Sequence, residues 1–157
     1  MKIKICITAI AFVLAGFNSN AQEWKTKGVA DVYELARKSA FNGNIPEAQA
    51  MLLHILDLAP DDHPVRTFLA RTYSWDGMKS EARAHLHIVL EKLPADAEAL
   101  QLSISLELQD ERYGNALALL DTAIVNHADK PEFLYQKAVI LHQLDLQEQS
   151  LEAVATL

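Results

Sequence analysis

The chain contains 157 residues, of which 50% are hydrophobic, and it carries a formal net charge of −7 at pH 7. This length and apolar content predict one domain with a continuous core and exclude a disordered chain. The acidic balance argues against a nucleic-acid partner, because neutralising phosphates requires a basic surface. With only 5 Gly and 5 Pro, the chain has few tight-turn residues, so an all-β sandwich is not expected.

Residues 1–21 have the three-part layout of a secretory signal peptide. Two lysines precede a mostly apolar run over residues 5–17, and Ser19 and Ala21 supply the small residues of a cleavage site. A transmembrane anchor is the alternative, but this run is shorter than the roughly 20 residues that span a bilayer. Cleavage would leave Gln22 first, with 12 Lys and Arg against 21 Asp and Glu (net charge −9) and no cysteine. We therefore expect an exported mature chain without disulfides and without a transmembrane segment.

From Val29 onward, the same residue types recur at a fixed spacing, as in the pairs Gly43 with Gly77 and Pro60 with Pro94. A period of about 34 residues predicts helix-turn-helix units that stack on one another. Small residues at this spacing would let paired helices approach closely. These small residues are Ala36, Ala48, Ala70, Ala82 and Ala116. After a lead-in over 22–28, the predicted units cover residues 29–62, 63–96, 97–130 and, in part, 131–157.

The ends of the predicted helices carry their own signals. Gly43 and Gly77 are expected to end the first helix of their units, because a left-handed backbone costs glycine least. Glu111 stands at this position in the third unit. Asn44 with its following Pro and Glu predicts a capping box for the second helix. Asp62 and the later Asp129 are expected to start first helices.

This pattern resembles the tetratricopeptide-repeat family over residues 29–157. The resemblance implies an all-α solenoid of helix-turn-helix repeats, about three and a half to four in number. The third unit departs from the family pattern, with Ile104 for a small residue, Glu111 for the turn glycine and Ala128 for a proline.

A narrower resemblance rests on Arg71, Tyr73, Ser74, Trp75 and Gly77 in the second unit. The string Arg-x-Tyr-Ser-Trp-x-Gly is similar to the periplasmic repeat region of YaiO-type outer-membrane β-barrel proteins. It is more distantly similar to the repeats of exopolysaccharide export porins. The chain shows no alternating strand pattern, so the resemblance extends only to the repeat segment of that family.

The family resemblance implies a concave groove, lined by the first helix of each repeat, in which a ligand lies. The expected binding residues are Tyr33, Arg37, Thr67, Arg71, Ser74, Trp75, Gln101, Ser105, Tyr135 and His142. The two arginines occupy the same position of successive repeats and are expected to lie side by side, where they could hold a carboxylate or stack on sugar rings. The alternative is that Trp75 packs against the next repeat and the arginines pair with carboxylates such as Glu34 and Asp76.

No catalytic residue, cofactor or metal site is expected. His85 and His87 are two residues apart on a predicted helix and point to different sides, whereas a zinc pair needs a spacing of three or four. The sequence has no Gly-x-Ser-x-Gly elbow and no glycine-rich phosphate loop. Asp62 and Asp110 lie in acidic pairs at predicted turns and are interpreted as solvated caps, not as calcium ligands.

Together, these observations favour a periplasmic repeat scaffold that binds a protein or peptide partner in the bacterial envelope, within an outer-membrane or polysaccharide-export system. One alternative is a carbohydrate-binding segment that guides an exopolysaccharide. Another is a structural adaptor that self-associates through the apolar C-terminal end around Leu151, Val154 and Leu157. Because this last helix ends in an apolar run, we expect either a partner to cover it or further chain to follow it.

Overall fold

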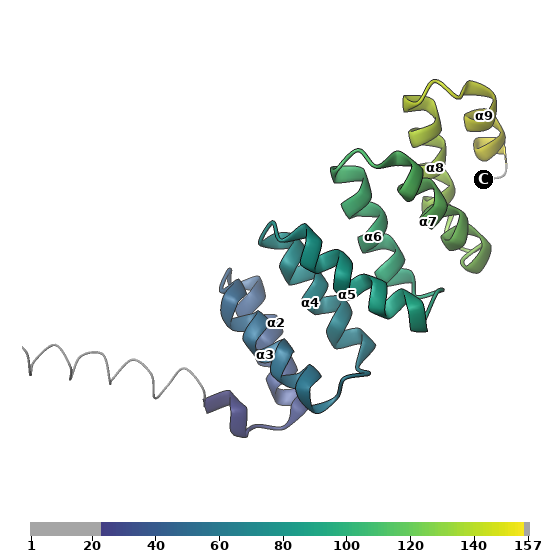
Figure 1. Cartoon of the computed structure of the whole chain (residues 1–157). Helices are drawn as coiled ribbons and strands as arrows, with labels where there is room; N and C mark the ends of the chain where they lie inside the picture. The colour runs from purple at the N-terminus through teal and green to yellow at the C-terminus, as the bar shows by residue number, and fades with distance from the viewer. Residues whose placement is uncertain (1–22, 156–157) are drawn as a thin grey trace, which may run out of the picture. The chain divides into compact units, whose positions relative to one another are not determined.

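A computed structural model describes residues 23–155, and these residues are all-helical, without a strand (Figure 1). The predicted signal peptide and Leu157 of the apolar end lie outside the described residues. The chain divides into two units, one up to Asp61 and one from Asp62 onward. The first unit contains the 3₁₀ helix η1 (Glu23–Thr26), α2 (Val29–Phe41) and α3 (Ile45–Leu58). The second contains α4 (His63–Trp75), α5 (Lys79–Lys92), α6 (Ala97–Gln109), α7 (Tyr113–Asn126), α8 (Pro131–Gln143) and α9 (Gln147–Ala155).

The helices form four hairpins, in each of which a first, or A, helix packs against the following B helix. The A helices are α2, α4, α6 and α8, and the B helices are α3, α5, α7 and α9. The A helices begin at Val29, His63, Ala97 and Pro131, so their starts are equally spaced at the period seen in the sequence. The all-α helix-turn-helix fold predicted from the sequence is therefore confirmed.

The turn inside each hairpin is the same in all four repeats. Gly43, Gly77, Glu111 and Asp145 all have a left-handed backbone, with φ of 84°, 77°, 55° and 60°. In each turn, the N–H of the next residue bonds to the carbonyl five residues earlier, as in the Met78 to Tyr73 bond of 2.9 Å. This is the Schellman motif that ends helices. The predicted glycine turns are confirmed, and the third and fourth turns keep the same geometry without glycine.

The helix starts confirm one capping prediction and correct two. The Asp62 carboxylate accepts a hydrogen bond from the N–H of Val65 at 3.1 Å, as expected for an N-cap. The capping box predicted at Asn44 is wrong, because its side chain makes no cap hydrogen bond and its amide donates to the Glu47 carboxylate instead. Asp129 is not the N-cap of α8, since Lys130 occupies that position.

In the first unit, the lead-in takes part in the packing. Trp24 of η1 is buried and lies edge-on against His54 of α3, with ring centroids 5.3 Å apart. Ala36 and Ala48, the small residues predicted at the α2–α3 contact, are both fully buried. The lead-in thus contributes a large apolar side chain to this hairpin.

In the second unit, the core runs from hairpin to hairpin in three clusters. One contains Ala70, Ala82 and Leu86 with Ala99 of the next A helix. The second lies around α6, α7 and α8; its buried members are Leu100, Ile104, Ala116, Leu120, Ala123, Phe133 and Ile140. The third joins Ala138, Leu141 and Ala153, with Leu117 packed against it. Within the described residues, no helix combines the length and apolar character needed to cross a membrane.

Candidate functional site

A groove lies on the A helices α6 and α8 of the second unit, at the start of α7. It has a volume of about 290 Å³ and is lined by Leu108, Tyr113, Tyr135, Gln136, Val139, Ile140 and Gln143. We refer to these residues as the A-helix groove. Most of its lining is aromatic or aliphatic, and two carboxamides supply polar groups. Such a combination is typical of surfaces that bind ligands in a fixed orientation.

Two features of the A-helix groove suit it to binding a ligand. Tyr135 is 63% exposed, so its ring is open to contact with a ligand. The side-chain oxygen of Gln136 is buried and accepts no hydrogen bond from any described residue. A buried acceptor without a donor costs about 1–3 kcal/mol, so the Gln136 side chain would gain from turning into the groove, where an N–H group could donate to it.

Of the residues predicted for binding, only Tyr135 lines the A-helix groove. In the first unit, the Arg37 guanidinium lies 5.9 Å from the Tyr33 ring and pairs with Glu34 at 3.4 Å. This ion pair is the one expected under the alternative interpretation. The predicted side-by-side placement of Arg37 and Arg71 joins two separate units and stays a prediction.

In the second unit, Arg71 pairs with Glu98 of α6 at 2.7 Å, so it does pair with a carboxylate, as under the alternative interpretation, but with Glu98 instead of Asp76. The partner belongs to the next A helix, which a local pattern does not reveal. Trp75 packs its ring edge against Phe68, with centroids 6.1 Å apart, yet remains 47% exposed. It therefore combines core packing with an exposed face.

The remaining predicted residues differ in accessibility. Thr67 is only 2% exposed, so its side chain offers no open binding surface. Ser74, Gln101 and Ser105 are half-buried, and His142 is exposed. Their role in binding stays a prediction.

An ion-pair network between α5 and α6 was not predicted from the sequence. Arg83 bonds to the buried Glu107 at 2.6 Å and to Asp110 at 2.5 Å, and Asp110 also pairs with Lys79. Asn115 of α7 donates to Glu107 at 3.0 Å. Asp110 is thus an ion-pair partner, which corrects its interpretation as a solvated cap. Two features of the sequence could have indicated this link. Lys79 and Arg83 of the second repeat are opposite in charge to Glu107 and Asp110 of the third, and the third repeat lacks the turn glycine.

The network shifts the pKa of both carboxyl groups. Hydrogen bonds from Lys79 and then Arg83 lower the pKa of Asp110 to about 2. Burial alone would raise the pKa of Glu107, but hydrogen bonds from Arg83 and Asn115 outweigh it, and the pKa lies below its ordinary value. Both groups are therefore ionised at neutral pH, and the network is held by charge.

The histidines lie apart, as the spacing predicts. His85 stacks on Tyr73 with ring centroids 5.4 Å apart and lies 3.4 Å from the Arg66 guanidinium, whereas the exposed His87 lies 3.5 Å from Glu91. Burial and then the charge of Arg66 lower the pKa of His85. Within residues 23–155, no three His, Cys, Asp or Glu side chains gather closely enough to hold a metal ion.

Comparison with known proteins supports the fold. A family model described as a tetratricopeptide repeat matches residues 33–103. The crystal structure of MamA protein has a TM-score of 0.71 at 17% identity, covering 82% of this chain and 70% of its own. MamA 41-end from Desulfovibrio magneticus gives 0.71 at 17% identity, covering 86% of this chain and 78% of its own.

A tetratricopeptide repeat protein from Parabacteroides merdae has a TM-score of 0.72 at 18% identity; the match covers 80% of this chain but 52% of that protein. No curated protein matches the sequence. At such identities, structural likeness carries the fold and not the ligand. The chain therefore has the fold of tetratricopeptide-repeat proteins, with a repeat-family match over residues 33–103.

Proposed function

We propose that this chain is an exported tetratricopeptide-repeat scaffold that binds a protein or peptide partner through the A-helix groove and catalyses no reaction. The carboxamide of Gln136 carries this proposal: its oxygen has no donor within the described chain, and rotation of the half-buried side chain into the groove would let it accept from a peptide N–H, which every residue except proline supplies. Tyr113 and the exposed Tyr135 add aromatic surface on which an apolar side chain of the partner can pack.

The carboxamides of the groove suit a peptide in particular. Gln136 and Gln143 each carry a donor and an acceptor, the same pair of groups that a peptide bond presents. Leu108, Val139 and Ile140 provide the apolar wall beside them. A short segment could thus place its backbone on the carboxamides and one side chain on the tyrosines.

Photo-crosslinking in cells tests this proposal. A crosslinking amino acid at position 135 is expected to yield a discrete adduct with a partner protein, and the same amino acid at position 58 provides the control. Leu58 is 64% exposed but belongs to α3, in the other unit. Equal adducts at both positions, or none at position 135, would contradict the proposal.

We further propose that the scaffold works in the bacterial envelope, as the soluble part of an outer-membrane or polysaccharide-export system. The signal-peptide pattern over residues 1–21 and the Arg71–Gly77 string support this proposal. Cell fractionation with mass spectrometry of the purified protein is the test. We expect a periplasmic product that begins at Gln22, and an uncleaved cytoplasmic product would refute export.

The exposed aromatic side chains favour one alternative, a carbohydrate ligand. Trp75 is 47% and Tyr135 63% exposed, and both belong to A helices of the second unit. Aromatic faces and an arginine such as Arg71 are suited to stacking on sugar rings. In this case, Trp75→Ala would abolish oligosaccharide binding while the circular dichroism spectrum stays helical. Unchanged binding would eliminate the alternative.

A further inference from the structure

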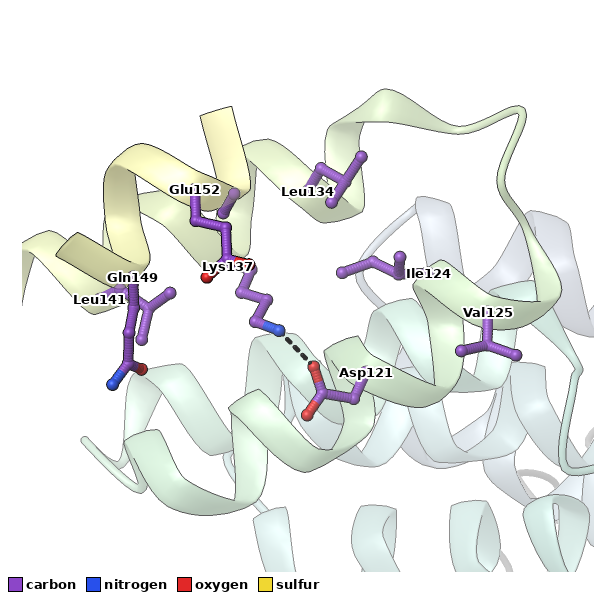
Figure 2. Close-up of a pocket in the computed structure, with 9 residues that line it drawn as sticks. Asp121, Ile124, Val125, Leu134, Lys137, Leu141, Gln149 and Glu152 are labelled. Atoms are coloured by element: carbon purple, nitrogen blue, oxygen red, sulfur yellow. Dashed lines mark hydrogen bonds and ion pairs between the residues drawn. The ribbon is translucent and has the colours of Figure 1, made fainter. Parts of the chain in front are cut away.

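A second hollow lies between the B helices α7 and α9, with α8 as its floor (Figure 2). It has a volume of about 530 Å³ and is lined by Asp121, Ile124, Val125, Leu134, Lys137, Leu141, Gln149, Glu152 and Ala153. We refer to it as the α7–α9 groove. None of these residues lines the A-helix groove, so the two surfaces are separate.

The preceding repeat carries an equivalent hollow between α5 and α7, with a volume of about 410 Å³. The two hollows are lined by equivalent positions of successive repeats. The matching pairs are His87 with Asp121, Leu90 with Ile124, Ser103 with Lys137, Glu107 with Leu141, Asn115 with Gln149, Ala118 with Glu152 and Leu119 with Ala153. One hollow can therefore serve as an internal reference for the other.

The floors of the two hollows differ in chemistry. In the α5–α7 hollow, the buried Glu107 bonds to Arg83 and fills the floor with an ion pair. At the same positions of the next repeat stand Leu141, which lines the α7–α9 groove, and Leu117, which packs in the same apolar cluster. At this position the second floor consequently carries no charge and presents hydrocarbon to a ligand.

The walls differ in size and polarity. Where Leu119 occupies the wall of the α5–α7 hollow, the smaller Ala153 stands in the α7–α9 groove. Val125 lines the α7–α9 groove, is 82% exposed and has the highest exposure among the large hydrophobic side chains of the described chain; the preceding repeat has Glu91 at this position. The α7–α9 groove is thus the larger of the two hollows.

The rim of this groove has a negative charge. Lys137 is engaged by Asp121 at 2.6 Å, and Glu152 lies across the groove on α9 (Figure 2). Two carboxylates and one ammonium line the opening, in a chain whose net charge is −7. A cationic partner is therefore favoured both at the rim and at long range.

We propose that the α7–α9 groove binds a cationic amphipathic helix of a partner protein. The apolar face of such a helix would lie on Leu141, Ala153 and Val125, and a lysine or arginine would meet Glu152. Helical ligands commonly insert their apolar face into a groove between helices. This surface is independent of the A-helix groove, so the scaffold would have two docking sites in one unit.

The test uses the chain from residue 22 onward and a labelled model helix of about 18 leucines and lysines, with the leucines on one face. A second peptide with glutamates in place of the lysines is the charge control. Fluorescence anisotropy is expected to show binding of the cationic peptide only. Val125→Ser is expected to weaken that binding about tenfold, which corresponds to roughly 1.4 kcal/mol. Leu58→Ser removes an exposed leucine in the other unit and should leave binding unchanged.

Charge and shape are tested separately. Glu152→Lys is expected to weaken binding of the cationic peptide about tenfold, whereas Asp57→Lys makes the same charge change on α3 and should not. Ala153→Leu restores the side chain found at position 119 and should exclude the helix. Because Ala153 is buried, the binding result for Ala153→Leu is interpreted only if thermal melting shows that this variant is folded. If it is not folded, Val125→Ser and Glu152→Lys still test the proposal.

Three results would overturn the proposal. Equal binding of the cationic and anionic peptides would remove the role of the charged rim. Loss of binding with Tyr135→Ala but not with Val125→Ser would move the helix to the A-helix groove. A wild-type dimer in sedimentation that Val125→Ser converts to a monomer would assign the groove to a second copy of this chain.

Discussion

Glu111 adopts the left-handed backbone of Gly77, which stands at the same point of the preceding hairpin. Their φ values are 55° and 77°, and both residues close a first helix by the same pattern of hydrogen bonds. This conformation costs a residue with a Cβ about 1–2 kcal/mol, whereas glycine adopts it without that penalty. The third repeat therefore keeps the turn geometry of the second, although Glu111 must adopt a strained backbone conformation.

The first prediction follows from this pair. Glu111→Gly is expected to raise the free energy of unfolding by about 0.5–1 kcal/mol, since relief of the backbone strain exceeds the entropy that glycine adds to the unfolded chain. Gly77→Ala is expected to lower it by about 1 kcal/mol. A Cβ at Gly77 would meet no atom within 4 Å, so that loss reports the backbone alone. Urea denaturation of both variants measures the effect, and a destabilised Glu111→Gly protein would contradict it.

The second prediction concerns the ion pair of Arg83 and Glu107. Glu107→Leu is expected to lower the free energy of unfolding by about 2–4 kcal/mol, because it leaves the half-buried Arg83 guanidinium with fewer acceptors. In the next repeat, the same two positions hold Leu117 and Leu141 in apolar contact. The double variant Arg83→Leu with Glu107→Leu should therefore recover much of the loss. Simple additivity in this double-mutant cycle would show that the two residues do not interact.

The third prediction is an acid transition that depends on Asp110. Its pKa is about 2 in the folded chain and 3.8 without partners. A lowered pKa gives stability that is present above pH 3.8 and is lost as the pH falls towards 2. The wild type should therefore lose stability more steeply than Asp110→Asn between pH 4 and pH 2. Urea denaturation at several pH values measures the two slopes, and parallel slopes would refute the assignment.

The fourth prediction concerns His85, whose pKa burial and Arg66 lower from its ordinary value of 6.5. The folded chain thus holds this histidine neutral, and its contribution is present above pH 6.5 and is lost as the pH falls further. His85→Phe keeps an aromatic ring against Tyr73 but removes the titrating group. Thermal melting at pH 7.5 and pH 5 should show a smaller decrease for this variant than for the wild type. His87→Phe provides the control, because His87 is exposed.

Much of the fold could be predicted from the sequence because the residues that define the repeat act on the backbone and helix contacts next to them. A glycine at a fixed point ends a helix, and an alanine between two helices permits close approach, so Gly43, Gly77 and Ala82 indicate structure directly. At Asn44, the same reasoning predicted a capping box that does not form. Asn44 is the N-cap of α3, as its residue type indicates, but its amide donates to the Glu47 carboxylate and its side chain does not cap the backbone, which the local pattern does not reveal.

The site was less predictable for a physical reason. Helical periodicity indicates the face on which a residue lies, but not how deeply its neighbours cover it. Thr67 and Tyr135 both lie on A helices, yet they are 2% and 63% exposed. Gln136, which holds the unpartnered oxygen, has no sequence signal that separates it from other glutamines. The partner of Arg71 is Glu98 of the next repeat, a pairing that depends on how α4 and α6 pack.

The affinity of the Gln136→Leu variant for the partner crosslinked at position 135 tests the central claim most directly. Removing a buried acceptor without a donor is expected to raise the free energy of unfolding by about 1 kcal/mol. The same change should weaken binding about tenfold or more, because the carboxamide that would turn into the groove to accept an N–H of the ligand is then absent. A more stable protein that binds less tightly would support the A-helix groove as the binding site. Unchanged affinity, with Tyr135→Ala equally without effect, would contradict it.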